Sequence, residues 1–139
     1  MIPMRERQTQ WFFCWAMFLC GAAFLIASRT VPSAMSIKQF GALAYDIPAE
    51  TWAMGYMSAS ALSAYGIHIN GRWRWSAVFR IAGYVALLSM FCVLIWSAWS
   101  APYGMQTVVF GGLFFVPVIV WFLRINLSDF GARWRNGTR

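Results

Sequence analysis

The sequence predicts an all-α membrane protein with four transmembrane helices, both termini in the cytoplasm, and a short interfacial helix between spans one and two. Three observations lead to this prediction. The first is composition: 60% of the 139 residues are hydrophobic and only 11% are charged, whereas a soluble domain carries about 25% charged residues. The other two are the positions of the basic residues and of the tryptophans, which gather at the ends of the apolar segments. Residues 1–139 are therefore expected to form a single integral membrane domain.

The first predicted span covers residues 11–28. This apolar run is close to the lower limit of about 17 residues for a helix that crosses a bilayer. Arg5 and Arg7 precede it, as in a signal peptide. However, the run is long for such a segment, and no good site for signal cleavage follows it. We therefore expect a retained helix, which ends at Arg29 and Thr30.

The segment between the first two spans, residues 31–48, is the longest connection in the chain. Apolar residues within it recur at near-helical spacing, which predicts a short helix over 33–45 lying at the outer membrane interface. The second span is expected over 49–69. It begins after Pro48, which suits the start of a helix because the missing N–H is not needed there. Glu50 then lies beside the positive end of the helix dipole.

The second span also carries small residues at four-residue intervals, namely Gly55, Ala59 and Ser63. Small side chains at this spacing allow another helix to approach closely. The sequence leaves two partners open for this helix-packing face, the helices of the same chain or a second copy of the protein. Packing within the chain is the favoured interpretation.

The third span is predicted over 77–99, after a tight turn with an Asn-Gly pair. The fourth is predicted over 106–123. It contains Pro117, which cannot donate a backbone hydrogen bond and therefore predicts a kink. Residues 124–139 are expected to form a cytoplasmic tail that lies on the inner leaflet or is partly disordered.

The basic residues orient the four predicted spans. Nine of the eleven lie on one side, eight of them in alternate segments outside the spans and Arg80 one turn inside the third span, and only Arg29 and Lys38 lie on the other side. Because cytoplasmic loops carry an excess of basic residues, both termini are assigned to the cytoplasm. This charge pattern and the compact loops indicate a multi-pass protein of the bacterial inner membrane. The nine residues are Arg5, Arg7, Arg72, Arg74, Arg80, Arg124, Arg133, Arg135 and Arg139.

The predicted hydrocarbon core carries no ionisable chemistry of the usual kind. The central parts of the four spans, residues 11–28, 51–67, 81–99 and 107–123, contain no Asp, Glu, Lys, Arg or His, although ion-coupled transporters and voltage sensors generally depend on such groups. The single histidine, His68, has no partners at ligand spacing, and the three cysteines all lie inside spans. We therefore expect no enzyme activity, no catalytic residue, no cofactor and no metal.

The inner border instead carries residues suited to lipid contact. Arginine binds phosphate and tryptophan fills the interface, so anionic headgroups are the expected partner, and nucleic acid is not. Arg80, one turn inside the third span, is expected to extend its guanidinium toward this border. A role of the Arg-Trp repeat in docking another protein stays open. The predicted anchoring residues are Arg72, Trp73, Arg74, Trp75, Arg80 and Arg124.

For function, the sequence favours a non-enzymatic accessory or assembly subunit of a membrane complex, whose other partners are membrane protein chains or further copies of itself. One alternative is a self-assembling, holin-like membrane pore of bacterial or phage origin. Its best candidates for pore-lining residues are Tyr56, Ser60, Ser63 and Ser89, which make only a thin polar stripe. The second alternative is a small solute transporter.

Overall fold

The computed structural model describes residues 4–30, 48–69, 73, 75–99 and 105–136. This part of the chain is all-helical, as predicted. The predicted interfacial helix over 33–45 lies outside the described residues. The four helices are α1 (Met4–Thr30), α2 (Ala49–His68), α3 (Ser76–Trp99) and α4 (Met105–Asn136).

Two helices are longer than the sequence suggested. α1 begins at Met4 rather than at residue 11, and α4 continues through Asn136 rather than ending at residue 123. The expected tail is therefore helical over most of its length. The physical reason is that the buried face of α4 does not stop at Phe122: Asn126 and Asp129 continue it at helical spacing. Pro117 lies inside α4, which is helical on both sides of it.

Three of these helices are long and apolar enough to cross a membrane, over Met4–Thr30, Ser76–Trp96 and Leu113–Ala132. Among the described residues α2 does not reach this standard, since serines and glycines lower its hydropathy. α2 starts directly after Pro48, whose carbonyl accepts hydrogen bonds from the backbone N–H groups of Thr51 and Trp52 at 2.9 and 3.4 Å.

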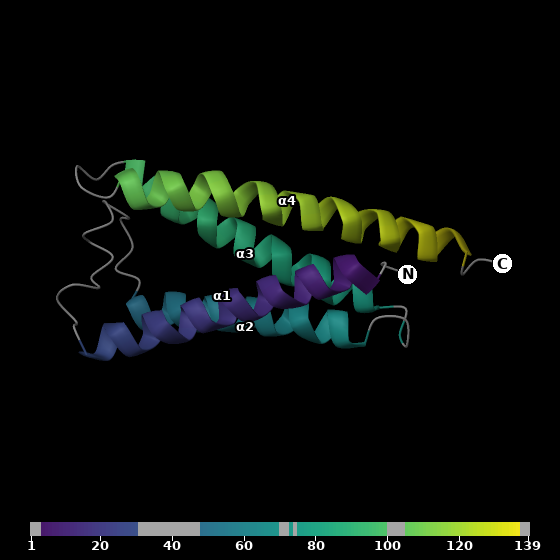
Figure 1. The fold of residues 1–139 in the computed structure, drawn as a ribbon, viewed down its shortest axis with the longest axis horizontal. Coiled ribbons are helices and arrows are strands. Elements are labelled where there is room, and N and C mark those ends of the chain that lie inside the picture. The colour runs from purple at the N-terminus through teal and green to yellow at the C-terminus, as the bar shows by residue number, and fades with distance from the viewer. Residues whose placement is uncertain (1–3, 31–47, 70–72, 74, 100–104, 137–139) are drawn as a thin grey trace.

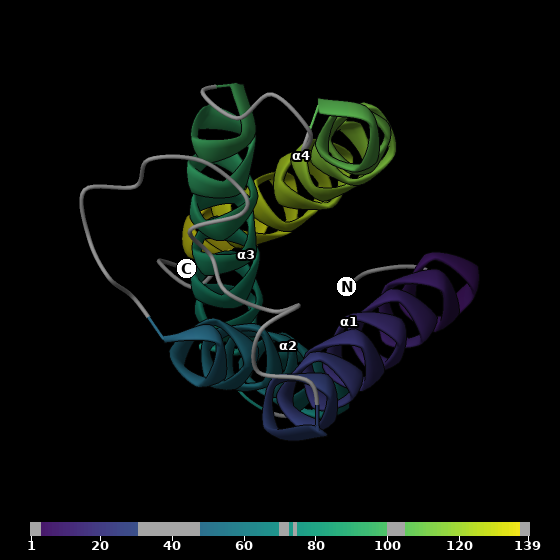
Figure 2. The same cartoon turned by 90° about the vertical axis from the view of Figure 1, so that its left-hand side faces the viewer.

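The helices run alternately up and down, so that α1 begins, α2 ends, α3 begins and α4 ends at one end of the molecule (Figure 1). We call this the basic end, because Arg5, Arg7, Arg80 and Arg135 all belong to its helix segments. Each helix packs mainly on the next one in the chain. Viewed along their length, the four helices form an open arc rather than a closed square (Figure 2).

Small residues set the closest helix contacts. A Cβ atom on Gly21 of α1 would lie 2.8 Å from Cγ of Met57 on α2. A Cβ atom on Gly83 of α3 would lie 2.6 Å from the carbonyl oxygen of Ala59 and 2.9 Å from the backbone nitrogen of Ser63. The backbones of α2 and α3 therefore approach closely at the small-residue face of α2.

Aromatic rings fill the inside of the arc. Phe13 of α1 lies 5.3 Å from Phe122 of α4, measured between ring centroids, and Phe122 lies 5.5 Å from Tyr84 of α3. Phe91 and Phe115 stack at 5.4 Å and join α3 to α4 further from the basic end. These spacings suit favourable edge-to-face and offset contacts between rings. The interior is thus a packed aromatic core shared by α1, α3 and α4.

Candidate functional site

A network of buried polar side chains lies on the basic-end side of the aromatic core. Gln10 of α1, Arg80 of α3 and Asn126 of α4 are all completely buried. Arginine, glutamine and asparagine are seldom buried without partners. These three side chains therefore identify the part of the interior where polar groups are buried together.

The first layer of this network centres on the Gln10 side-chain oxygen. It accepts a hydrogen bond from the Asn126 amide at 3.3 Å and a long one from the Tyr84 hydroxyl at 3.5 Å. The same Asn126 amide donates to the Phe122 carbonyl at 2.7 Å. The Cys14 sulfur lies 3.6 Å from the Tyr84 hydroxyl. One oxygen of α1 thus contacts both α3 and α4, although Gln10 is 74 and 116 positions from its partners Tyr84 and Asn126.

The second layer is an ion pair between α3 and α4. The Arg80 guanidinium donates to a carboxylate oxygen of Asp129 at 2.7 Å. The side chains are 0% and 6% exposed, respectively. At such burial the attraction is only weakly screened, and each charge stabilises the other against the cost of leaving water.

The local backbone of α2 makes room for this ion pair. A Cβ atom on Gly66 would lie 2.7 Å from Cγ of Arg80, 2.8 Å from the Ser76 carbonyl oxygen and 2.9 Å from the Arg80 nitrogen. Only a glycine leaves this space free for the aliphatic part of the arginine. Three helices therefore surround Arg80. The residue belongs to α3, Asp129 of α4 forms an ion pair with it, and Gly66 of α2 packs against its side chain.

The network combines amides, one hydroxyl, one thiol and an ion pair, which hold one another by hydrogen bonds and charge. The described residues contain no group of three His, Cys, Asp or Glu side chains placed to hold a metal ion.

No family model matches this chain, and no curated protein or solved structure matches it either.

The predicted anchoring residues have different surroundings. Trp73 and Trp75 are about half exposed next to the start of α3, and Arg124 is exposed on α4. Arg72 and Arg74 lie outside the described residues. Arg80 differs from the expectation, since its guanidinium does not extend to the border but is buried against Asp129. The sequence argument missed this because it placed Asp129 in a tail beyond the last helix.

The predicted packing face faces inward. Ala59 and Ser63 lie against Gly83 of α3, and a Cβ atom on Gly55 would lie 2.7 Å from the terminal methyl of Met90, also on α3. These contacts use, within one chain, the surface that a second copy would otherwise contact.

The proposed pore-lining residues do not share one surface. Ser60 and Ser63 are completely buried and Tyr56 is partly buried. Ser89 is exposed on α3, and its hydroxyl donates to the Val85 carbonyl at 2.9 Å. The structure brings the three α2 residues together along one helix and separates Ser89 from them.

Proposed function

We propose that this chain is a non-enzymatic membrane protein that serves as an accessory or assembly subunit of a membrane complex. We further propose four transmembrane helices in a bacterial inner membrane, with both termini in the cytoplasm. Three helices are apolar enough to span. α2 packs between α1 and α3, and its 20 residues correspond to about 30 Å of helix. Its position supports the view that α2 crosses together with its neighbours.

The observation that carries the functional proposal is the filled interior. Rings from α1, α3 and α4 contact one another across it, and the charged groups within it neutralise each other in the Arg80–Asp129 pair. A transporter needs a polar site that can open to each side of the membrane. A packed aromatic core with a buried polar network at one end instead favours a rigid body whose outer faces contact lipid or other chains.

Large apolar side chains on the outside of the arc supply such faces. On α1, Phe12 is 76% exposed, and on α4, Phe114 is 69% exposed. In a bilayer, partner chains recognise surfaces of this kind by shape and close packing, because the lipid is equally apolar. The proposal therefore places partner contacts on the outer faces of α1 or α4.

The test is native mass spectrometry of the tagged protein, extracted gently from its own membranes. Unrelated chains in a fixed ratio support the proposal. Phe12→Ala and Phe114→Ala then map the contact: the variant on the partner-binding face should reduce co-purification several-fold, while the other serves as its matched control. A single species of this 15.8 kDa chain, as monomer or homo-oligomer without partners, contradicts the proposal.

The alternative of a holin-like, self-assembled pore has one observation in its favour. Within the described part of the chain, four buried polar atoms on α2 have no hydrogen-bond partner, and they recur along the helix at Trp52, Tyr56, Ser60 and Ser63. Water would satisfy them, since buried polar groups without partners are costly. A homo-oligomer that conducts ions in planar bilayers would support this alternative over the accessory subunit.

A further inference from the structure

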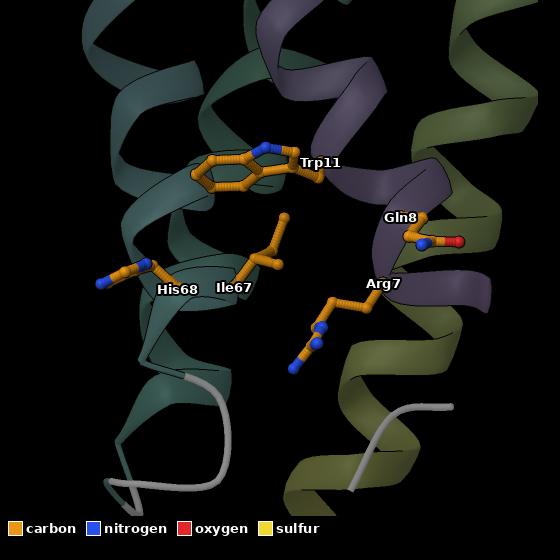
Figure 3. A pocket seen from close by; sticks show the side chains of 5 residues that line it. All are labelled: Arg7, Gln8, Trp11, Ile67 and His68. Carbon is orange, nitrogen blue, oxygen red and sulfur yellow. The ribbon is translucent and has the colours of Figure 1, made fainter. Parts of the chain in front are cut away.

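A pocket at the basic end lies outside the buried network. It is a hollow of about 300 Å³ between the first turns of α1 and the last turn of α2. In Figure 3, Arg7 extends from α1 toward the end of α2, and the Trp11 ring extends from α1 in the same direction. The lining residues are Arg7, Gln8, Trp11, Ile67 and His68.

The lining of this pocket suits an anion. Arg7 is always charged and offers up to five donors. In Figure 3 the indole nitrogen of Trp11 and the ring of His68 are turned away from Arg7, so the guanidinium is the donor that an anion would meet. Among the described residues, no carboxylate lines the pocket. In the described part of the chain, Arg7 makes no ion pair. The dipoles of the α1 start and the α2 end have opposite signs and largely cancel, so the guanidinium decides the sign of the field.

A row of aromatic side chains, Trp11, Trp15 and Phe18, leads away from the pocket along α1. We call this row the aromatic lane. Trp11 contacts Trp15 with ring centroids 6.2 Å apart, and Trp15 contacts Phe18 at 5.9 Å. Trp11 and Trp15 are 36% and 49% exposed. This lane starts at the cationic pocket and continues into the apolar part of a helix that is long enough to span a membrane. A free phosphate ion would use the pocket alone, whereas a phospholipid would use both.

We propose that this pocket binds the phosphodiester headgroup of an anionic phospholipid, with an acyl chain lying along the aromatic lane of Trp11, Trp15 and Phe18. Arg7 holds the phosphate by charge-assisted hydrogen bonds. Trp11 lies at the boundary between headgroup and chain, where indole rings are most stable. The site belongs to a single chain and does not depend on the proposed partner subunit.

The experiment measures lipid binding to the full-length protein in detergent by native mass spectrometry. Phosphatidylglycerol and phosphatidylcholine are the probes, and inorganic phosphate is the competitor. We expect Arg7→Gln to weaken phosphatidylglycerol binding about tenfold, since hydrogen bonds to charged groups are worth at least this much. Arg7→Lys should recover only part of the loss, because lysine cannot bind two oxygens in parallel.

The matched control is Arg5→Gln, which removes the same charge from an exposed position on the same helix outside the pocket. It should change binding less than twofold. Trp15→Ala tests the lane independently of Arg7 and should also weaken binding several-fold. Equal losses from Arg7→Gln and Arg5→Gln would show diffuse attraction and overturn the site. Competition by millimolar phosphate, or no effect of Trp15→Ala, would overturn the lipid assignment.

Discussion

Two ion pairs of this molecule join neighbouring helices under opposite conditions. Arg80 of α3 meets Asp129 of α4 at 2.7 Å, with side chains 0% and 6% exposed. Arg29 of α1 meets Glu50 of α2 at 3.6 Å, with side chains 70% and 50% exposed. The first lies inside the basic end and the second on the surface of the opposite end. We expect the stability of the fold to depend on the buried pair and to depend little on the exposed pair.

The difference becomes clear if the acidic partner of each arginine is removed. If Glu50 were lost, Arg29 would simply turn to water or headgroups, because it is already exposed. If Asp129 were lost, Arg80 would remain buried beneath Gly66 without the carboxylate that it meets at 2.7 Å. Breaking a buried pair is costly for this reason, even where forming the pair adds little.

The largest expected effect comes from breaking the buried pair on one side. Asp129→Asn, or Arg80→Met, should lower the free energy of unfolding by about 3–5 kcal/mol, the usual range when one buried ion loses its partner. The measurement is unfolding in mixed micelles by SDS titration, followed by circular dichroism. A loss below about 1 kcal/mol for both single variants would show that the pair behaves like a surface pair.

A double variant separates the effect of the two charges on stability from the effect of the volume of the two side chains. Arg80→Met combined with Asp129→Leu removes both charges and keeps the space filled, and such replacements are often neutral or stabilising. We expect it to recover most of the stability lost in either single variant. If the double variant is as unstable as the sum of the single variants, shape rather than charge explains the site.

The sequence predicted the helices better than it predicted this pair. Apolar segments, Pro48 and the border tryptophans were enough to place α2 and α3 within about one residue. The extension of α4 was also visible in principle: Phe115, Ile119, Phe122, Asn126 and Asp129 recur three or four residues apart, and the last four are buried. The polarity of the last two led to a tail being predicted instead.

The partners themselves could not be predicted. Arg80 and Asp129 are 49 positions apart, and Gln10 and Asn126 are 116 apart. Spacing along one helix says which residues share a face, but not which face of another helix it meets. Lone polar residues inside apolar spans therefore indicate that a partner exists without identifying it. Gln10 gave no such signal, because it lies in the polar run over 5–10, before the predicted first span.

Two helical glycines, Gly83 and Gly131, provide a second comparison between an interior and a surface position. A Cβ atom on Gly83 would collide with Ala59 and Ser63 of α2, whereas a Cβ atom on Gly131 of α4 would meet nothing within 4 Å. Alanine is intrinsically better than glycine in a helix by about 1 kcal/mol. Gly131→Ala should therefore be neutral or slightly stabilising in the same SDS titration.

Gly83→Ala should instead destabilise by about 1–3 kcal/mol, because the contacting atoms include backbone that cannot move aside cheaply. Both variants make the same chemical change on a helix, so their difference isolates the α2–α3 contact. Equal stability of the two variants would mean that α2 and α3 do not depend on this close approach.

The smallest effect is expected at the exposed pair. Arg29→Gln and Glu50→Gln should each change the free energy of unfolding by about 0–1 kcal/mol, and raising the salt concentration should reduce even this difference. Under the same salt change, Arg80→Met should keep its effect, since the buried pair is not reached by mobile ions. The salt dependence of the unfolding free energy therefore distinguishes the buried pair from the exposed pair. If Arg29→Gln cost as much as Arg80→Met at high salt, burial would not be what distinguishes the two ends of the molecule.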